Sequence, residues 1–165
     1  MAFFRHEFLG RGKGSLSCGL FYLFWAICQK EEHTTVDEDL IIVTAPNESG
    51  RKFIKLLIYL KRPFAVLTNN LKEERALKKL GITQIIRIHT NNTDEWVVPE
   101  QRVGRIFIFE NSLNLTCRYL QICRPWTSRP IYVITRGGNS PGIYRGLGAN
   151  HIIHTRNSEV GFLLK

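Results

Sequence analysis

The sequence predicts an α/β protein with a doubly wound parallel sheet of about six strands, built from two βαβαβ halves and preceded by an apolar N-terminal helix. Three observations support this prediction. From Leu40 onward, short apolar segments alternate with helical segments, the pattern of a parallel sheet. The apolar segments are nearly continuous, as in strands that are covered on both faces. The second half of the chain also repeats the first at a constant offset of 67 residues.

The alternation defines the expected elements. The strands are expected at Leu40–Thr44, Phe64–Thr68, Gln84–His89, Arg105–Glu110, Ile131–Thr135 and His151–Thr155. The helices between them are expected at Ser49–Leu60, Lys72–Leu80, Leu113–Arg124 and Pro141–Leu147. Residues 90–104 would form the crossover between the two halves, and their sequence is barely helical.

Identical residues mark the internal repeat. Arg62-Pro63 recurs as Arg129-Pro130, and Leu80-Gly81 recurs as Leu147-Gly148. A glycine that ends a helix is common to many βαβ units, but two shared dipeptides in one register favour a duplication. Two such halves give the strand order 3-2-1-4-5-6, in which ligands bind at the carboxyl ends of the neighbouring strands 1 and 4.

Residues 1–39 are expected to form an extension to a domain of residues 40–165. In this extension the apolar segment Ser15–Cys28 follows a basic start and precedes an acidic linker, residues 29–39. Its apolar side chains make a broad helical face, as in a helix packed against a sheet. A membrane anchor, an interfacial helix and a cleaved signal are the alternatives, although a membrane span needs roughly 20 residues. The expected location is cytoplasmic, with association to a membrane or a partner protein through residues 15–28.

The chain is basic, with a net charge of +9. The segment between Leu40 and Thr90 contains ten lysine and arginine residues and three glutamates, so its net charge is +7. Such an excess suits an anionic partner, whether nucleotide, nucleic acid or anionic lipid. It equally suits solvated helix faces that keep a protein soluble. The four cysteines form no CxxC pair and no zinc-type spacing with histidine, so no metal site is expected.

The segment Leu40–Arg51, LIIVTAPNESGR, is the candidate ligand site around which the sheet is expected to be built. An apolar strand passes through a short polar loop into a helix near Gly50. The free N–H groups and the positive dipole end of such a helix attract a phosphate.

Two longer passages carry a family resemblance. ALKKLGITQIIRIHT (Ala76–Thr90) and YRGLGANHIIHT (Tyr144–Thr155) resemble the "helix, Leu-Gly-Ala, strand" passages of NAD(P)-binding Rossmann domains. They are similar to the cofactor domain of medium-chain dehydrogenases and quinone reductases, and to the regulatory nucleotide-binding domain of potassium channels and transporters. A weaker likeness, around PIYVITRGG (Pro130–Gly138), is to the structural half of ketoreductase domains.

The resemblance implies a phosphate-binding loop of the form G-x-G-x-x-G, and the chain departs from it. Ala45, Asn47 and Gly50 stand at the three glycine positions. Gly50 would keep the helix close to the strand, whereas Asn47 would hinder the approach of a pyrophosphate to bare backbone. Pro46 removes one N–H donor. Cofactor binding is therefore expected to be weakened.

The second predicted strand ends in Thr68-Asn69-Asn70, where NAD-binding families carry an acidic residue for the ribose. This absence argues against NAD and leaves NADP as the cofactor to test, with Lys72 and Arg75 near its 2′-phosphate. An exposed helix face is the simpler explanation of these cations. The expected cofactor-binding residues are Ala45, Asn47, Ser49, Gly50, Arg51, Thr68, Asn69, Asn70, Glu110 and Asn111.

Catalytic patterns are missing from the sequence. It contains no Tyr-x-x-x-Lys pair, no nucleophile elbow and no Walker lysine, and no second domain is evident that would bring a substrate to a nicotinamide. We therefore expect a degenerate, non-catalytic Rossmann domain that acts as a regulatory or assembly module and binds nucleotide weakly or not at all. The alternatives are an NADP-dependent oxidoreductase, either a fragment or a homodimer that completes its site, and a basic nucleic-acid-binding protein. The latter is disfavoured because the aromatic residues do not interleave with exposed cations.

Overall fold

Six parallel strands form one sheet in the computed structural model of the chain, which describes residues 39–90, 98–137, 141–155 and 160–164. The strands are β1 (Leu40–Thr44), β2 (Phe64–Thr68), β3 (Ile85–Arg87), β4 (Val103–Phe109), β5 (Ile131–Thr135) and β6 (His151–His154). Their order is β3-β2-β1-β4-β5-β6, and every neighbouring pair is parallel. The predicted strand order and direction are confirmed.

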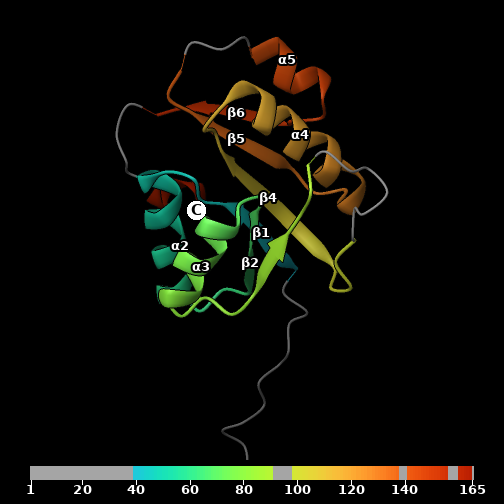
Figure 1. Ribbon diagram of the computed structural model, residues 1–165. Coiled ribbons are helices and arrows are strands. Elements are labelled where there is room, and N and C mark those ends of the chain that lie inside the picture. Colours follow the sequence, from blue (N-terminus) through green and yellow to red (C-terminus); the bar gives the residue numbers. More distant parts are fainter. Residues whose placement is uncertain (1–38, 91–97, 138–140, 156–159, 165) are drawn as a thin grey trace, which may run out of the picture. The chain divides into compact units, whose positions relative to one another are not determined.

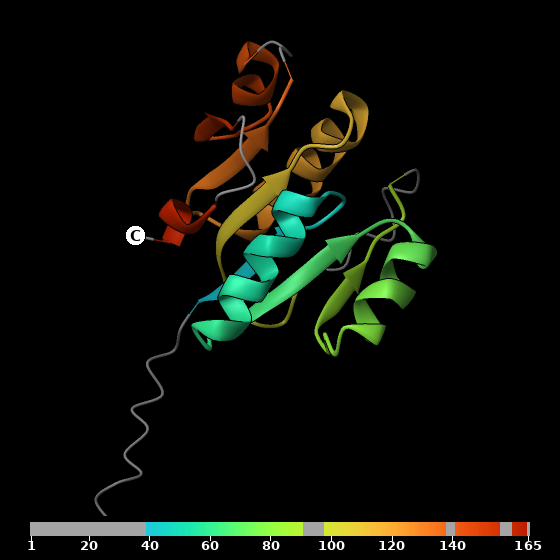
Figure 2. The same cartoon turned by 90° about the vertical axis from the view of Figure 1, so that its left-hand side faces the viewer.

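Helices cover both faces of this sheet (Figure 1, Figure 2). α2 (Glu48–Tyr59) and α3 (Leu71–Lys79) pack on one face. α4 (Leu113–Cys123), the 3-10 helix η3 (Arg124–Trp126) and α5 (Pro141–Gly146) pack on the other. A last 3-10 helix, η4 (Gly161–Leu164), adds Leu163 to the core beneath α2. The arrangement is doubly wound, as predicted.

Side chains of each strand alternate between the two core clusters, because successive residues of a strand point to opposite faces. In β1, Ile41 and Val43 lie in the cluster beneath α2 and α3, whereas Leu40 and Ile42 lie in the cluster beneath α4 and α5. All five residues of β1 are buried, which is expected of a central strand covered on both sides. The edge strands β3 and β6 are only partly buried, so the prediction of complete cover was wrong for them.

Several predicted boundaries were wrong by one or two residues. β3 is shorter than predicted, because an edge strand has a neighbour on one side only; β4, between two neighbours, begins two residues earlier. α2 and α3 each begin and end one residue before the predicted limits, since Asn47 and Asn70 cap them. α4 ends at Cys123, because Pro125 lacks the N–H that a longer α-helix would need. α5 and β6 each end one residue early.

The internal repeat is visible in the backbone. Gly81 follows α3 with φ +80° and Gly148 follows α5 with φ +98°, in the equivalent Leu-Gly dipeptides. Positive φ is costly for residues with a Cβ and readily adopted by glycine, so both glycines turn the chain from a helix back toward the next strand.

Parts of the predicted organisation fall on residues that the structure does not describe. The apolar segment 15–28, the linker up to residue 38 and residues 91–97 of the crossover lie outside the described ranges. The described residues belong to one compact unit, residues 37–165. Within the described ranges, no helix combines the length and hydropathy needed to cross a membrane.

Candidate functional site

A crevice of about 440 Å³ opens at the carboxyl ends of β1 and β2, beside the starts of α3 and α4. Parallel α/β sheets bind ligands at this edge, where the strand order reverses direction between β1 and β4. Four of the ten predicted site residues line it: Arg51, Asn69, Asn70 and Asn111. The other lining residues are Thr44, Pro46, Leu67, Lys72, Glu73, Ala76, Leu115 and Tyr119.

The side chain of Asn47 stabilises the β1–α2 loop through two hydrogen bonds. Asn47 Oδ1 accepts a hydrogen bond from the Gly50 N–H at 3.0 Å and so caps α2. Asn47 Nδ2 donates to the backbone carbonyl of Glu110 at 3.0 Å, which ties the loop to the end of β4. Asn47 therefore bridges β1 and β4 where the second glycine of a dinucleotide loop would leave bare backbone for a pyrophosphate.

Gly50 packs directly on the strand that precedes it. A Cβ added at this position would lie 2.7 Å from the Cα of Ala45 and 3.0 Å from the Thr44 carbonyl oxygen, too close for any side chain. The close helix–strand packing expected at the third glycine is present in this loop. Ala45 itself is buried, 2% exposed, beneath α2.

A cation from the second half of the chain reaches the start of α2. Arg136 Nη2, after β5, donates to Ser49 Oγ at 2.6 Å, and Ser49 is buried. Together with the exposed Arg51, this arginine adds positive charge beside the helix start. Hydrogen bonding to Lys52, and then the charge of Lys52, lower the pKa of Glu48 at the same turn.

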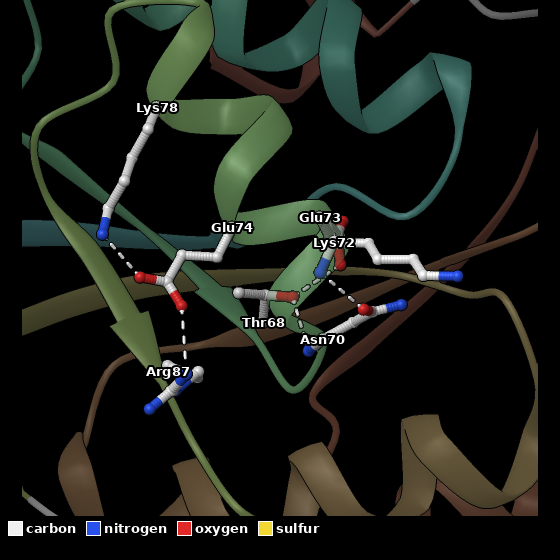
Figure 3. A network of polar contacts seen from close by, with 7 residues as sticks. All are labelled: Thr68, Asn70, Lys72, Glu73, Glu74, Lys78 and Arg87. Carbon is white, nitrogen blue, oxygen red and sulfur yellow. Dashed lines mark hydrogen bonds and ion pairs between the residues drawn. The ribbon is translucent and has the colours of Figure 1, made fainter.

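The β2–α3 turn is arranged differently (Figure 3). Thr68 Oγ1 donates to Glu73 Oε2 at 2.6 Å and accepts from the Asn70 N–H at 3.1 Å. Asn70 Oδ1 accepts from the Lys72 N–H at 2.8 Å and caps α3. The turn is thus fixed by a threonine and an asparagine that sequence analysis had assigned to a cofactor.

Glu73 is a crevice-lining residue that the sequence analysis did not include among the site residues. Its Oε1 is buried and accepts no hydrogen bond, although an unpartnered buried acceptor costs about 1–3 kcal/mol. Glu73 lines the crevice and stands roughly 20 residues after the loop, where dinucleotide-binding folds place the carboxylate for the ribose. The sequence signal was available, but the carboxylate lies in the first turn of α3 instead of at the end of the strand.

Two further side chains border this part of the crevice. The Tyr119 hydroxyl, from α4, donates to Asn69 Oδ1 at 3.3 Å. Burial, and then the nearby charge of Glu73, raise the pKa of Tyr119 well above its ordinary value, so the phenol stays protonated as a donor. The geometry therefore offers one buried acceptor and one protonated tyrosine within the same crevice lining.

The two predicted site residues after β4, Glu110 and Asn111, have different surroundings. Asn111 lines the crevice. The Glu110 side chain instead accepts a hydrogen bond from the Tyr144 hydroxyl of α5, at 2.5 Å from Oε1. Among the described residues, no group of three or more His, Cys, Asp and Glu side chains is arranged to hold a metal ion.

Comparisons with known proteins agree with this geometry at the level of the fold. No protein-family model and no curated protein matches the chain. Among solved structures, the chain is similar to the TrkA-N domain of the inner membrane protein ybaL from Escherichia coli. That match has a TM-score of 0.55 and 10% identity, and covers 71% of this chain and 87% of that domain. The chain shares the fold of TrkA-N domains.

Two other solved structures extend the comparison. The NAD(P)-binding domain of an exopolyphosphatase-related protein from Archaeoglobus fulgidus matches with a TM-score of 0.58 and 13% identity, over 70% of this chain and 86% of that one. The GsuK channel bound to NAD matches with a TM-score of 0.56 and 15% identity, over 81% of this chain but only 25% of that one. The predicted resemblance to the nucleotide-binding domains of channels and transporters is thereby confirmed as a likeness of fold.

Proposed function

We propose that the chain is a non-catalytic regulatory or assembly module of the TrkA-N and RCK type, and that its crevice binds an adenine nucleotide weakly through the ribose. The observation that carries this proposal is Glu73, a residue of the crevice lining whose Oε1 is buried and has no hydrogen-bond partner. A turn of this side chain toward the crevice would let a ribose hydroxyl donate to the oxygen and would remove the cost of leaving it without a partner. GsuK, whose RCK domain has the same fold, has been solved bound to ADP and bound to NAD.

The proposed weakness follows from the β1–α2 loop. Both polar atoms of the Asn47 side chain are already hydrogen-bonded, to Gly50 and Glu110, and Pro46 has no N–H to donate. A diphosphate would therefore meet fewer free donors than in a glycine-rich loop. Arg51 and Lys72 line the crevice and supply the compensating positive charge.

Glu73 also bears on the choice of cofactor. A carboxylate beside the ribose repels a 2′-phosphate and favours a free 2′-hydroxyl. We therefore propose ADP or NAD ahead of NADP, in place of the NADP expectation drawn from the sequence. An NADP-dependent oxidoreductase is correspondingly the weaker alternative. Association with a membrane or partner through residues 15–28, homodimer formation and nucleic-acid binding stay predictions.

A thermal-unfolding titration of the full chain with ADP, NAD and NADP tests the proposal. We expect a saturable rise of the midpoint with ADP and NAD and a smaller one with NADP; ligand at about 100 times its Kd adds roughly 2.7 kcal/mol. Glu73→Gln should narrow the difference between NAD and NADP, because it removes the charge that repels the 2′-phosphate. The matched control is Glu100→Gln, which neutralises an exposed glutamate outside the crevice lining.

Arg51→Ala should weaken all three nucleotides, with Lys55→Ala as its control on the exposed side of the same helix. Midpoints that do not move at millimolar nucleotide would overturn the nucleotide-binding proposal. Equal shifts for NAD and NADP in the wild-type chain, unchanged by Glu73→Gln, would overturn the role given to Glu73.

A further inference from the structure

The two edge strands of the sheet, β3 and β6, differ in how well their outer sides are protected. β3 has three residues and ends in Arg87, which pairs with Glu74 of α3 at 3.5 Å. A short edge strand with a charged side chain resists pairing with another chain. β6, His151–His154, contains no lysine, arginine, aspartate, glutamate or proline. Its outer side is therefore the more open of the two edges.

The hydrogen-bonding pattern decides which residues of β6 point away from the sheet. The Thr155 N–H, directly after β6, donates to the Thr135 carbonyl of β5 at 3.0 Å. Because alternate residues of a strand bond to the same neighbour, the odd-numbered residues of β6 face β5. On β5 the even-numbered residues bond to the β4 side instead, as the Ile134 carbonyl does. The even-numbered residues of β6, Ile152 and His154, therefore direct their N–H and carbonyl groups outward.

These outward groups have no partner within the described part of the chain. No described loop or helix donates to, or accepts from, the backbone of Ile152 or His154. β6 is nevertheless held in place on β5, in register over its whole length, and the His151 ring stacks on the Tyr132 ring at 4.8 Å. A strand that is already extended and fixed loses little conformational freedom when it pairs with another strand.

From these observations we propose that β6 is an interaction surface for β6 of a second copy of this chain, which pairs with it antiparallel across a two-fold axis. The axis passes beside Ile153, so that Ile152 of each copy lies opposite His154 of the other. These are the residues with outward groups, and residues opposed in this way in an antiparallel ladder exchange both of their backbone hydrogen bonds. The register therefore satisfies the outward groups of both strands in one contact, which an unrelated extended peptide would do only by chance.

The same register brings compatible side chains together. Ile153 lies opposite Ile153 of the second copy in a non-hydrogen-bonded pair, the arrangement in which opposed side chains are closest. This side chain is partly buried on the face of the sheet beneath α2, so the pairing extends an apolar surface that is already present. Although the chain has a net charge of +9, β6 contains no lysine or arginine, so no such cations oppose each other along the strand. A two-fold contact of this kind closes with two copies and predicts a dimer.

The surface is separate from the nucleotide crevice, whose lining contains no residue of β6. Because the paired β6 strands run in opposite directions, the two crevices lie at opposite ends of the joined sheet. Edge pairing is therefore compatible with nucleotide binding and does not require it, so the two proposals can fail separately.

Sedimentation velocity of the full chain over a range of concentrations measures the association, and amide hydrogen exchange locates it. We expect a reversible dimer, with exchange at the Ile152 and His154 amides that slows as the protein concentration rises. Ile85 and Arg87 are the internal controls, because their backbone groups point outward from β3 in the same way. Their exchange should not depend on concentration.

Substitutions at the edge sharpen the test. His154→Pro removes an outward N–H without removing a bond to β5, and edge strands accept proline at such positions. We expect it to weaken dimerisation by about tenfold, equivalent to about 1.4 kcal/mol, because the symmetric contact loses this hydrogen bond twice. His154→Gln is the matched control, since it keeps the N–H and should leave dimerisation unchanged. Ile153→Lys, which sets two lysines opposite each other at the axis, should also weaken it, and circular dichroism checks that each variant folds.

A wild-type chain that stays monomeric at millimolar concentration would overturn the proposal. A dimer in which the Ile152 and His154 amides gain no protection would also overturn it, because the contact would lie elsewhere. Equal dimerisation of His154→Pro, Ile153→Lys and the wild-type chain would do the same. Protection of these amides in a monomer, independent of concentration, would mean that another segment of the same chain pairs with β6, and would equally contradict a contact between two copies.

Discussion

The β1–α2 and β2–α3 turns are built to the same plan and end differently. Each leaves the carboxyl end of a buried strand and begins a helix with an asparagine cap, Asn47 in the first turn and Asn70 in the second. The first turn commits both polar atoms of Asn47 to its own backbone and to β4. The second leaves Glu73 Oε1 buried without a partner. Under the proposed function, the first turn therefore offers a phosphate few free donors, whereas Glu73 in the second turn offers the ribose an acceptor.

The largest loss of stability is expected from a substitution at Gly50, in the first turn. In Gly50→Ala the new Cβ would meet the backbone of Ala45 and Thr44, which cannot move aside as a flexible side chain would. We expect a loss of about 3 kcal/mol in the free energy of unfolding, the upper range for an overpacked core. Chemical denaturation measures it.

Gly146→Ala is the matched control, since a Cβ at Gly146 in α5 meets nothing within 4 Å. It should leave stability unchanged or raise it by up to about 1 kcal/mol, because alanine favours a helix over glycine. Equal effects of the two substitutions would show that close packing at the first turn is not what stabilises it.

The second-largest effect is expected at the two asparagine caps, whose removal should destabilise the protein to different extents. Asn47→Ala removes a cap and the bond to the Glu110 carbonyl, so we expect a loss of about 2 kcal/mol in unfolding free energy. Asn70→Ala removes a cap alone, with an expected loss of about 1 kcal/mol. Urea denaturation of both variants gives the comparison directly. If Asn70→Ala were the more costly, the first turn would not be the more rigidly held of the two.

The smallest effect concerns the acidic pair at the start of α3. Glu74, next to Glu73, bonds Lys78 at 2.6 Å and pairs with Arg87 of β3 at 3.5 Å (Figure 3). Hydrogen bonding to Lys78 is the largest cause that lowers the pKa of Glu74; burial, the next largest, raises it, and the charges of Lys78, Arg87 and Arg75 lower it further, so that the net direction is down.

Because the pKa of Glu74 is lower in the folded state, its ionised carboxylate stabilises the fold at a pH above the ordinary pKa. This contribution is lost as the pH falls below about 4.5. Glu74→Gln should therefore show a slightly smaller loss of stability on acidification than the wild-type chain. The measurement is the thermal midpoint between pH 7 and pH 3. An identical acid response in both proteins would mean that this surface network does not help to hold α3 on β3.

The fold could be predicted from the sequence because periodicity and the repeat both report on the backbone. The run Leu40–Thr44 and the Leu-Gly dipeptides at residues 80 and 147 are local signals, and the strand order followed from their duplication. Boundaries were less predictable, because the length of β3 depends on its position at the edge of the sheet.

The candidate site was less predictable, for a physical reason. Asn47 was assigned to a cofactor, but its partner Glu110 lies 63 residues away and becomes visible only when β1 and β4 are paired. Glu73 was overlooked because a carboxylate in the first turn of a helix is usually a dipole or surface residue. Its hydrogen bond with Thr68 and its place in the crevice lining become visible only in the folded structure.

The difference between the two turns is tested most directly by the backbone amide NMR spectrum of the full chain during titration with ADP. The account predicts that the largest saturable shifts fall on the second turn, at Asn69, Asn70, Lys72 and Glu73. Smaller shifts should appear at Arg51 and in the first turn. Dominant shifts at residues 45–50, or a spectrum that ADP leaves unchanged at millimolar concentration, would contradict it.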